Sequence, residues 1–531
     1  MNAETIHRRR WAILGVLNLS VFLVVVDNTI VNVALPTLSR ELNASTSQLQ
    51  WIVDAYSLAF AGLLLAFGSL GDRFGRKGAL QLGLTMFAGF SVLAAISTNA
   101  GQLIAARVAM GTAAAMVFPA TLAILINVFT VPAERAKAIG IWAGTAGIAV
   151  ALGPITGGYL LEHFWWGSVF FVNVPIVIVA LLVGRGILPT SKDPNAGRLD
   201  LVGLVSSIAA VTLLVYTVIE APRYGWGTGR TIGGFVLAAA LLAGFVLWEL
   251  KRRDPMLDVR FFTNARFTAG SVSISIAFFA LFGFVFLITQ YFQLVRGYAT
   301  LSAGVHTLPF AIGAGIASPF GAQLALKLGT KVVVAGGLVL MALGFVVAAT
   351  LHTDTAYWGP VVISMLLIAF GLGLCTAPAT EAIMGSLPVE KAGVGSAVND
   401  TTRELGGSFG VAVMGSVFSS VYGPKIADKL SGNVLPPAGL KAAKESVAAA
   451  VEIANRFPFE AVRNGIIGAA RSAFLEGMHA SSWIAAGAAV VGAALAFAFL
   501  PARAGDGGDH GGHGGGAAGD PAVLEEVGEA S

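Results

Sequence analysis

The chain alternates long apolar segments with short polar loops, and this alternation restricts its fold more than any other feature. Fourteen segments approach the roughly 20 apolar residues that a helix needs to cross a bilayer. They lie near residues 11–35, 51–71, 78–97, 102–127, 139–161, 168–187, 200–219, 231–250, 267–292, 302–324, 331–350, 358–383, 402–422 and 481–501. Only 12% of the 531 residues are charged, against roughly 25% in soluble domains. We therefore expect an all-α polytopic membrane protein.

Basic residues are concentrated in alternate loops, which predicts the orientation of the chain. One set of loops carries the basic clusters at residues 8–10, 73–77 and 251–253, whereas the loops between them hold few basic residues. Because basic loops of membrane proteins stay in the cytoplasm, we expect both termini there. This bias explains the net charge of +4 without any binding to nucleic acid.

Two motifs occur twice in the same order, which indicates an internal repeat. The loop after the second segment reads LGDRFGRK at 70–77, and the loop after the tenth reads LALKLGTK at 324–331. The fourth and twelfth segments share the pattern Pro-Ala-Thr-x-Ala-Ile at 119–124 and 378–383. A shift of eight segments with unchanged topology predicts two six-helix bundles related by an axis along the membrane normal, with a pair of helices inserted between them.

This repeat sets the expected domain boundaries. We expect a cytoplasmic N-terminus at 1–10, a first bundle at 11–187 and a linker with the inserted pair at 188–265. The second bundle follows at 266–501, and the Gly- and His-rich composition of residues 502–531 predicts a disordered cytoplasmic tail.

A long stretch between the last two segments, residues 424–480, belongs to neither span. Residues 440–453 and 461–474 show helical apolar spacing on either side of Pro458. This pattern predicts an extracellular amphipathic hairpin that covers the outer mouth or lies on the membrane. The alternative is a passive loop.

The first apolar segment contains an acid, Asp27. An Asp at the centre of a membrane helix costs about 2.5 to 3.5 kcal/mol on insertion scales, so it usually faces protein or water and contacts a substrate, an ion or a proton. Arg107 in the fourth segment lies toward the same end of the membrane, so the two side chains can meet inside the first bundle. The pair is a candidate for proton coupling, and the alternative is a static structural ion pair.

Four further acids are candidates for a substrate cavity. Asp400 and Glu404 are one turn apart and share a helix face that would attract a cation, although a solvated helix start is the alternative. Glu381 replaces Leu122 of the first repeat copy in an otherwise shared motif, which favours a site and a position deep in the membrane. Asp54 lies one turn into the second segment, where the helix macrodipole alone also favours an acid.

The loop after the second segment contains Gly68, Asp72, Arg73, Gly75 and Arg76. Asp72 can accept backbone hydrogen bonds at the helix end and pair with an Arg of a neighbouring helix. Such contacts would latch a cytoplasmic gate, and the alternative is that these residues only fix the topology.

The fifth segment carries Gly153, Pro154, Gly157 and Gly158, which leave one flank without side chains. Another helix can therefore approach closely, and the backbone can bend. We interpret this flank as a seam against the opposite bundle that controls alternating access. A general small-residue packing face is the alternative.

The sequence also restricts the energy source and the cofactors. No GK[ST] triplet of a P-loop occurs, so an ion gradient has to drive any transport. The single cysteine, Cys375, allows neither a disulfide framework nor a cysteine metal site within the chain. We expect no enzyme activity, no cofactor and a monomer in the lipid bilayer.

Four of these motifs resemble those of one family. The loop at 68–77 resembles the loop signature of the major facilitator superfamily, and residues 103–111 resemble its fourth-helix Arg motif. Residues 153–158 resemble the motif that marks its antiporters, and residues 27–36 are similar to the first-helix motif of its fourteen-helix drug:proton antiporters.

Residues 51–54 and 166–170 narrow this resemblance to multidrug exporters of the QacA, SmvA and LfrA kind. The resemblance implies a major facilitator fold and a proton-coupled antiporter that exports lipophilic, often cationic drugs by alternating access. Two alternatives are an exporter restricted to one antibiotic, lipid or metabolite, and a membrane sensor that reuses the transporter fold.

Overall fold

The computed structural model describes residues 3–192, 200–252, 255, 257–387, 392–430 and 435–500. The predicted tail at 502–531 lies outside these residues. Every regular element in the described part of the chain is helical. Fourteen helical stretches there are long and apolar enough to cross a membrane, which confirms the predicted polytopic all-α fold.

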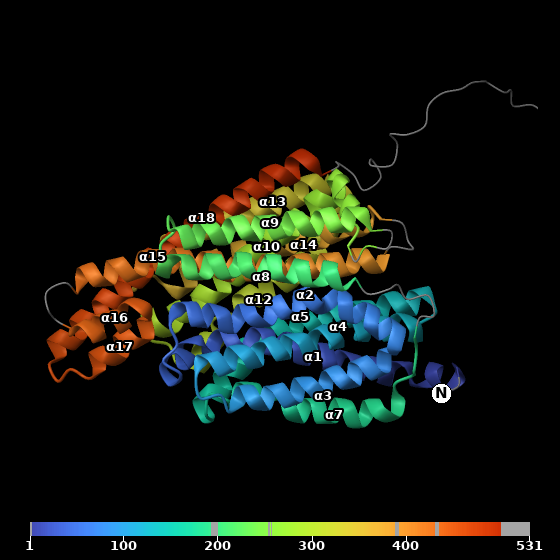
Figure 1. The fold of residues 1–531 in the computed structure, drawn as a ribbon, viewed down its shortest axis with the longest axis horizontal. Helices are drawn as coiled ribbons and strands as arrows, with labels where there is room; N and C mark the ends of the chain where they lie inside the picture. Colours follow the sequence, from blue (N-terminus) through green and yellow to red (C-terminus); the bar gives the residue numbers. More distant parts are fainter. Residues whose placement is uncertain are drawn as a thin grey trace, which may run out of the picture.

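The first half of the chain forms a bundle of helices that pack side by side (Figure 1). Its elements are α1 (Ala3–Glu41), α2 (Thr46–Phe74), α3 (Arg76–Ala95), α4 (Ala100–Val128), α5 (Pro132–His163), α6 (Ser168–Phe171) and α7 (Asn173–Ile187). The inserted pair follows as α8 (Leu201–Tyr224) and α9 (Gly229–Lys251). The short α6 and α7 together make the sixth span.

The second bundle follows the inserted pair. Its elements are η1 (Val259–Thr263), α10 (Ala265–Gln290), η2 (Tyr291–Val295), α11 (Thr300–Val305), α12 (Leu308–Leu328), α13 (Thr330–Ala348), η3 (Tyr357–Val361), α14 (Val362–Met384), α15 (Ala392–Lys429), α16 (Pro437–Glu445), α17 (Val447–Asn455) and α18 (Glu460–Phe499). The tenth span is broken between α11 and α12. Proline lies in the first turn of α12, where its missing N–H costs no hydrogen bond, so a new helix can begin there.

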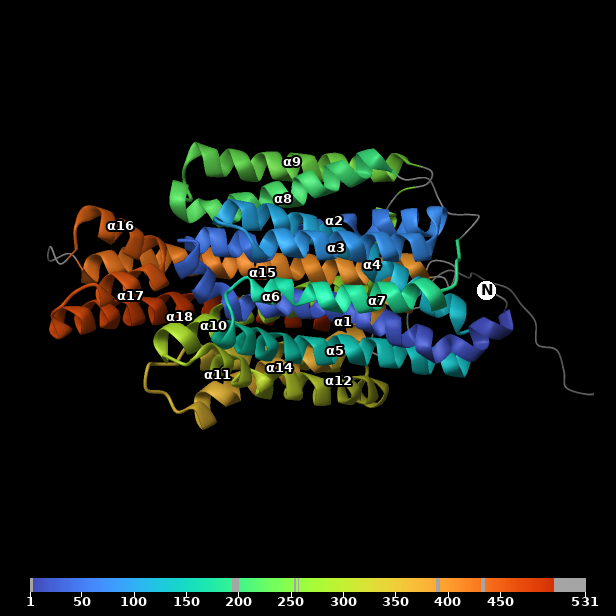
Figure 2. The same cartoon turned by 90° about the horizontal axis from the view of Figure 1, so that it is seen from below.

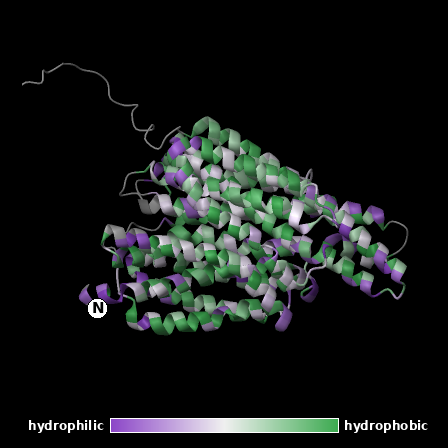
Figure 3. Cartoon of the chain, turned by 180° about the vertical axis from the view of Figure 1, so that it is seen from behind, coloured by the Kyte–Doolittle hydropathy of each residue, from purple (hydrophilic) through white to green (hydrophobic). Residues whose placement is uncertain are grey.

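The long axis of the molecule has two distinct ends. Residue 3 and the last described residues of α18 lie at one end, which we call the terminal end, and α16 and α17 lie at the other, which we call the cap end (Figure 1). Figure 3 shows apolar residues along the length of the helices, whereas hydrophilic residues gather toward the two ends. This distribution is expected for helices that cross an apolar layer.

The cap differs from the expected hairpin at both of its predicted helices. Residues 440–453, predicted as one helix, are divided between α16 and α17, because Ser446 has an extended backbone and caps α17. Residues 461–474, predicted as a separate second helix, are the first turns of α18, which continues without a break into the last span. Pro458 precedes the helix and no proline interrupts it, so the chain has no reason to stop. The cap is held to α15 because the Tyr422 hydroxyl donates to the Ala443 carbonyl over 2.9 Å.

The inserted pair forms an outer layer on one side of the molecule (Figure 2). Helix α8 packs against both bundles, since its Val215 and Ile219 share an apolar cluster with Leu58 of α2 and Ala412 of α15. Asp200 caps α8 by accepting hydrogen bonds from the Val202 and Gly203 N–H groups.

Asp200 also joins the two inserted helices at the terminal end. Its carboxylate accepts a hydrogen bond from the Trp248 indole over 2.9 Å and pairs with Arg252 over 3.3 Å. Burial opposes the charge of Asp200. The hydrogen bonds from Gly203 and Trp248 and the Arg252 guanidinium outweigh that effect and lower the pKa of this carboxyl below its ordinary value.

Candidate functional site

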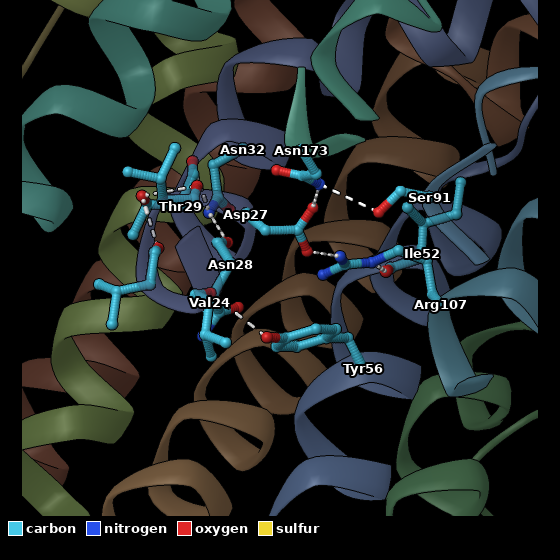
Figure 4. A network of polar contacts seen from close by, with 12 residues as sticks. Val24, Asp27, Asn28, Thr29, Asn32, Ile52, Tyr56, Ser91, Arg107 and Asn173 are labelled. Atoms are coloured by element: carbon cyan, nitrogen blue, oxygen red, sulfur yellow. Dashed lines mark hydrogen bonds and ion pairs between the residues drawn. The ribbon is translucent and has the colours of Figure 1, made fainter. Parts of the chain in front are cut away.

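A buried ion pair lies inside the first bundle (Figure 4). Arg107 of α4 donates to one carboxylate oxygen of Asp27 on α1 over 2.6 Å, and both side chains have no exposed surface. The other oxygen accepts from the Asn173 amide on α7 over 2.7 Å, and that amide also donates to the Ser91 hydroxyl on α3. The charge of Asp27 is therefore compensated on both oxygens.

Arg107 is fixed by α2 as well. Its Nε donates to the Ile52 carbonyl over 3.0 Å, and its guanidinium carbon lies 4.2 Å from the centre of the Tyr56 ring (Figure 4). The Tyr56 hydroxyl donates back to the Val24 carbonyl of α1. A guanidinium over an aromatic face is stabilised by the ring quadrupole.

Sequence reasoning paired Asp27 with Arg107 but missed Asn173, Ser91 and Tyr56. Asn173 could have been found, because it is a polar residue between Val172 and Val174 in an apolar segment. Ser91 and Tyr56 gave no comparable signal, since serine and tyrosine are common in membrane helices.

Asp54 differs from Asp27 in having no hydrogen-bond partner among the described residues. Its side chain has no exposed surface, and neither carboxylate oxygen makes a hydrogen bond in the described part of the chain. One turn earlier on α2, the Gln50 amide donates across to the second bundle, to the Val411 and Ala412 carbonyls of α15 over 3.2 and 3.0 Å. Asp54 therefore follows directly after a contact between the two bundles.

Asp400 and Glu404 lie on α15 and are only partly buried. Glu404 forms a side-chain hydrogen bond with Ser57 of α2. Arg403, on the same helix, lies close enough to act electrostatically on both acids, and its guanidinium also lies 5.4 Å from the centre of the Phe278 ring and donates to Thr380 over 3.1 Å. The contact with Ser57 places Glu404, and with it the neighbouring Asp400, at the junction of the bundles.

Contrary to the prediction from the sequence, Glu381 does not lie deep in the membrane region of its helix. It lies in the last turn of α14, three residues before the helix ends at Met384, and its side chain is exposed. The repeat motif identified Glu381 as an acid that the first copy lacks. Where the helix ends and which way the side chain points depend on the neighbouring helices, so the motif could not predict its exposure.

The glycines of α5 face two different partners. A Cβ atom on Gly153 would collide with Thr29 of α1, and one on Gly157 would lie 2.6 Å from Ile30 of the same helix. A Cβ atom on Gly158 would lie 2.6 Å from the Thr300 carbonyl oxygen of α11, in the opposite bundle. The backbone of α11 also approaches α5 closely at Pro154. A Cβ atom on Gly304 of α11 would collide with the Pro154 carbonyl.

Hydrogen bonds join the two bundles toward the cap end. Thr289 of α10 donates to the Asn32 carbonyl over 3.0 Å, and the neighbouring Gln293 donates to Val33 over 2.8 Å. Further contacts of this kind are Thr300 to the Gly158 carbonyl, the Leu301 N–H to Glu162, and Ser39 to Ser446. These contacts hold the cap ends of the bundles together in this conformation.

The loop between α2 and α3 lies at the terminal end. Asp72 pairs with Arg76, the first residue of α3, over 2.6 Å, and both side chains are partly exposed. Gly75 has a φ of 124°, which favours glycine, and its N–H closes α2 on the Gly71 carbonyl. Gly68 packs on Pro119 of α4, whereas Arg73 is exposed.

Comparisons with known proteins agree with this arrangement. Residues 17–411 match the Major Facilitator Superfamily. The chain is 37% identical to the multidrug efflux pump LfrA of Mycolicibacterium smegmatis, over 92% of this chain and 96% of LfrA. It is 38% identical to the methyl viologen resistance protein SmvA of Salmonella typhimurium, over 88% and 93%. It is 32% identical to the tetracenomycin C resistance and export protein of Streptomyces glaucescens, over 93% and 92%.

Solved structures show the same fold. An inward-facing, unoccupied bacterial homolog of the human lysosomal transporter Spinster has a TM-score of 0.64, covering 92% of this chain and 96% of that one at 17% sequence identity. Together with the fourteen membrane helices and the bacterial relatives, the family match shows that this chain is a multi-pass bacterial inner-membrane transporter of the Major Facilitator Superfamily.

Proposed function

We propose that the chain is a proton-coupled antiporter that exports lipophilic, often cationic drugs. The observation that carries this proposal is the close contact of α5 with α11 at Gly158 and Gly304, where the two bundles meet backbone to backbone. Two bundles that touch through glycines can part without unlocking large side chains. The chain works as a monomer on small-molecule substrates and protons, and it needs no cofactor.

The predicted orientation of the loops indicates to which side of the membrane this conformation is open. If the basic terminal end is cytoplasmic, the contacts at the cap end close the outer side, so the protein faces inward. Drug would then enter from the cytoplasm or the inner leaflet. The Asp72 and Arg76 pair, with Gly68, Arg73 and Gly75 around it, would act as the cytoplasmic gate when the bundles rock to the other side.

Asp27 and Arg107 are the proposed proton-coupling pair. In this conformation Arg107 and Asn173 compensate the carboxylate, so proton uptake requires the pair to open. One proton moving through 100 mV supplies about 2.3 kcal/mol, and each pH unit adds about 1.4 kcal/mol. These energies suffice for a ratio of drug concentrations across the membrane of about tens to hundreds per proton.

The acids of the second bundle are the proposed source of preference for cations. Asp400 and Glu404 are partly buried where the bundles meet, and we assign Glu381 to the mouth of the same cavity. Asp54 is fully buried in this conformation, and we assign it to the cavity that opens when the bundles part. A charge 4 Å from a bound cation is worth about 1 to 4 kcal/mol at the effective dielectric constants of water and of a protein surface. Asp400→Asn should therefore weaken the export of a cationic dye more than that of a neutral compound.

An exporter with one natural substrate is the second candidate. It is supported by the full-length similarity to the tetracenomycin C resistance and export protein, which is named for a single compound. The two candidates differ in breadth, so a panel of dyes, quaternary ammonium compounds and antibiotics separates them. Protection of an efflux-deficient host against several unrelated cations supports the multidrug proposal, and protection against one compound supports the alternative.

Ethidium efflux from proteoliposomes tests the coupling. We expect transport only when a proton gradient is imposed, and loss of transport when an ionophore collapses the gradient. Efflux that persists without any gradient would contradict antiport.

A further inference from the structure

We propose that Asp54 is a second proton-binding residue, and that its proton keeps the two bundles together in this conformation. This inference deepens the proposed antiport and rests on it. Asp54 lies on a face of α2 that packs against α15, which we call the α2–α15 seam. Its residues are Gln50, Asp54 and Ser57 on α2 and Glu404, Ser408, Val411 and Ala412 on α15.

Two contacts across the seam bracket Asp54. Gln50 reaches the carbonyls of Val411 and Ala412 on one side of it, and Ser57 reaches Glu404 on the other. Residues 50, 54 and 57 share one face of a helix, because they are spaced by four and three positions. The two helices run in opposite directions, so Asp54 lies level with Ser408, which is 1% exposed and whose hydroxyl also lacks a partner in the described residues.

A charged Asp54 does not fit this position. A carboxylate without hydrogen bonds or a counter-ion in a dry interior is unfavourable by several kcal/mol, and such a group binds a proton instead. Asp27 is equally buried but has two donors on its oxygens. In this conformation the carboxyl that requires a proton is therefore Asp54.

In the part of the chain that the structure describes, no charged group of a neighbouring helix pairs with Asp54. Most of these groups are already engaged with one another or with other partners. Asp27 of α1 pairs with Arg107 of α4, and Glu220 pairs with Arg223 on α8. Helix α15 contributes Asp400, Arg403 and Glu404. Arg76 and Lys77 of α3 lie at the terminal end.

The proposed cycle follows from where Asp54 can meet water. When the cap ends part, the seam opens and Asp54 takes a proton from the outer solution on a carboxylate oxygen. Closure of the seam then traps the neutral acid. Glu404, which is bonded to Ser57 and only partly buried, lies next along the seam toward the terminal end and is the acceptor through which the proton can leave inward.

Spin labels at the cap ends of the two bundles test this inference without substrate or gradient. Arg40→Cys on α1 and Asp354→Cys before α14 place labels on exposed positions, and the buried Cys375 stays unlabelled. With Asp54 intact, pulsed EPR should show a short distance at low pH that lengthens as the pH rises. In Asp54→Asn, a neutral mimic of the protonated acid, the distance should stay short at every pH.

Further variants separate the proton from other causes. Asp54→Leu should behave like Asp54→Asn and fold well, because the position offers no hydrogen bonds to lose. Asp54→Glu should retain the pH-dependent shift, as should Glu452→Gln, which removes a partly exposed acid of α17. A shift that survives in Asp54→Asn or Asp54→Leu, or that is absent with Asp54 intact, would overturn the inference. Ethidium efflux tests the antiport separately, so the two proposals can fail independently.

Discussion

Replacing one member of the buried pair should cost far more than replacing both. Arg107→Leu leaves Asp27 with the Asn173 amide but without its counter-ion, in a place where neither side chain has exposed surface. Removing one partner of a buried pair typically costs about 3 to 5 kcal/mol, whereas replacing both partners by apolar residues of similar volume is often neutral or stabilising. Asp27→Leu should cost a similar amount, because it leaves the guanidinium of Arg107 uncompensated.

The measurement is the free energy of unfolding from denaturant titrations in mixed micelles. We expect each single variant to lose about 3 to 5 kcal/mol and the double variant Asp27→Leu with Arg107→Leu to recover most of that loss. A loss below about 1 kcal/mol in Arg107→Leu would refute the view that the pair is dry and charged.

Transport by the same variants separates the two interpretations of the pair. If Asp27 couples protons, the double variant regains stability but not ethidium efflux. If it regains both, the pair is only structural, and proton coupling has to be assigned elsewhere.

Three further predictions follow from single contacts. Gly158→Leu should disrupt the contact with α11, because overpacking costs about 1 to 3 kcal/mol. It should therefore lengthen the EPR distance between the cap ends. Gly140→Leu is the control and should leave that distance unchanged, because a Cβ atom on Gly140 meets open space. Asp72→Ala should increase the accessibility of a cysteine placed in the α2–α3 loop, whereas Leu326→Ala in the repeat copy should have little effect; equal effects would show that the two copies are equivalent. Asp200→Asn should lower thermal stability at neutral pH. The pKa of Asp200 in the folded protein lies below its ordinary value, so the wild type should be more stable than the variant at pH values above the ordinary carboxyl range. This difference in stability should vanish as the pH falls through the folded pKa. A difference that persists in acid would contradict this reasoning.

The sequence by itself determined the membrane fold and much of its organisation. Fourteen apolar segments and their loops sufficed because a helix in lipid has to satisfy its own backbone and needs about 20 apolar residues to cross. The pairing of Asp27 with Arg107 was also accessible, since a charge inside an apolar helix needs a partner and few candidates exist.

The tertiary structure decided which polar groups found partners. Asp27 and Asp54 look alike in the sequence, as single acids in apolar helices, yet among the described residues Asp27 receives two donors and Asp54 receives none. It also decided that α18 absorbs residues 461–474, that Glu381 ends exposed at the end of α14, and that the α5 glycines divide between α1 and α11. Periodicity and composition report how apolar a helix is, but partners depend on the rotation and register of each helix against its neighbours, which are fixed only when the helices pack.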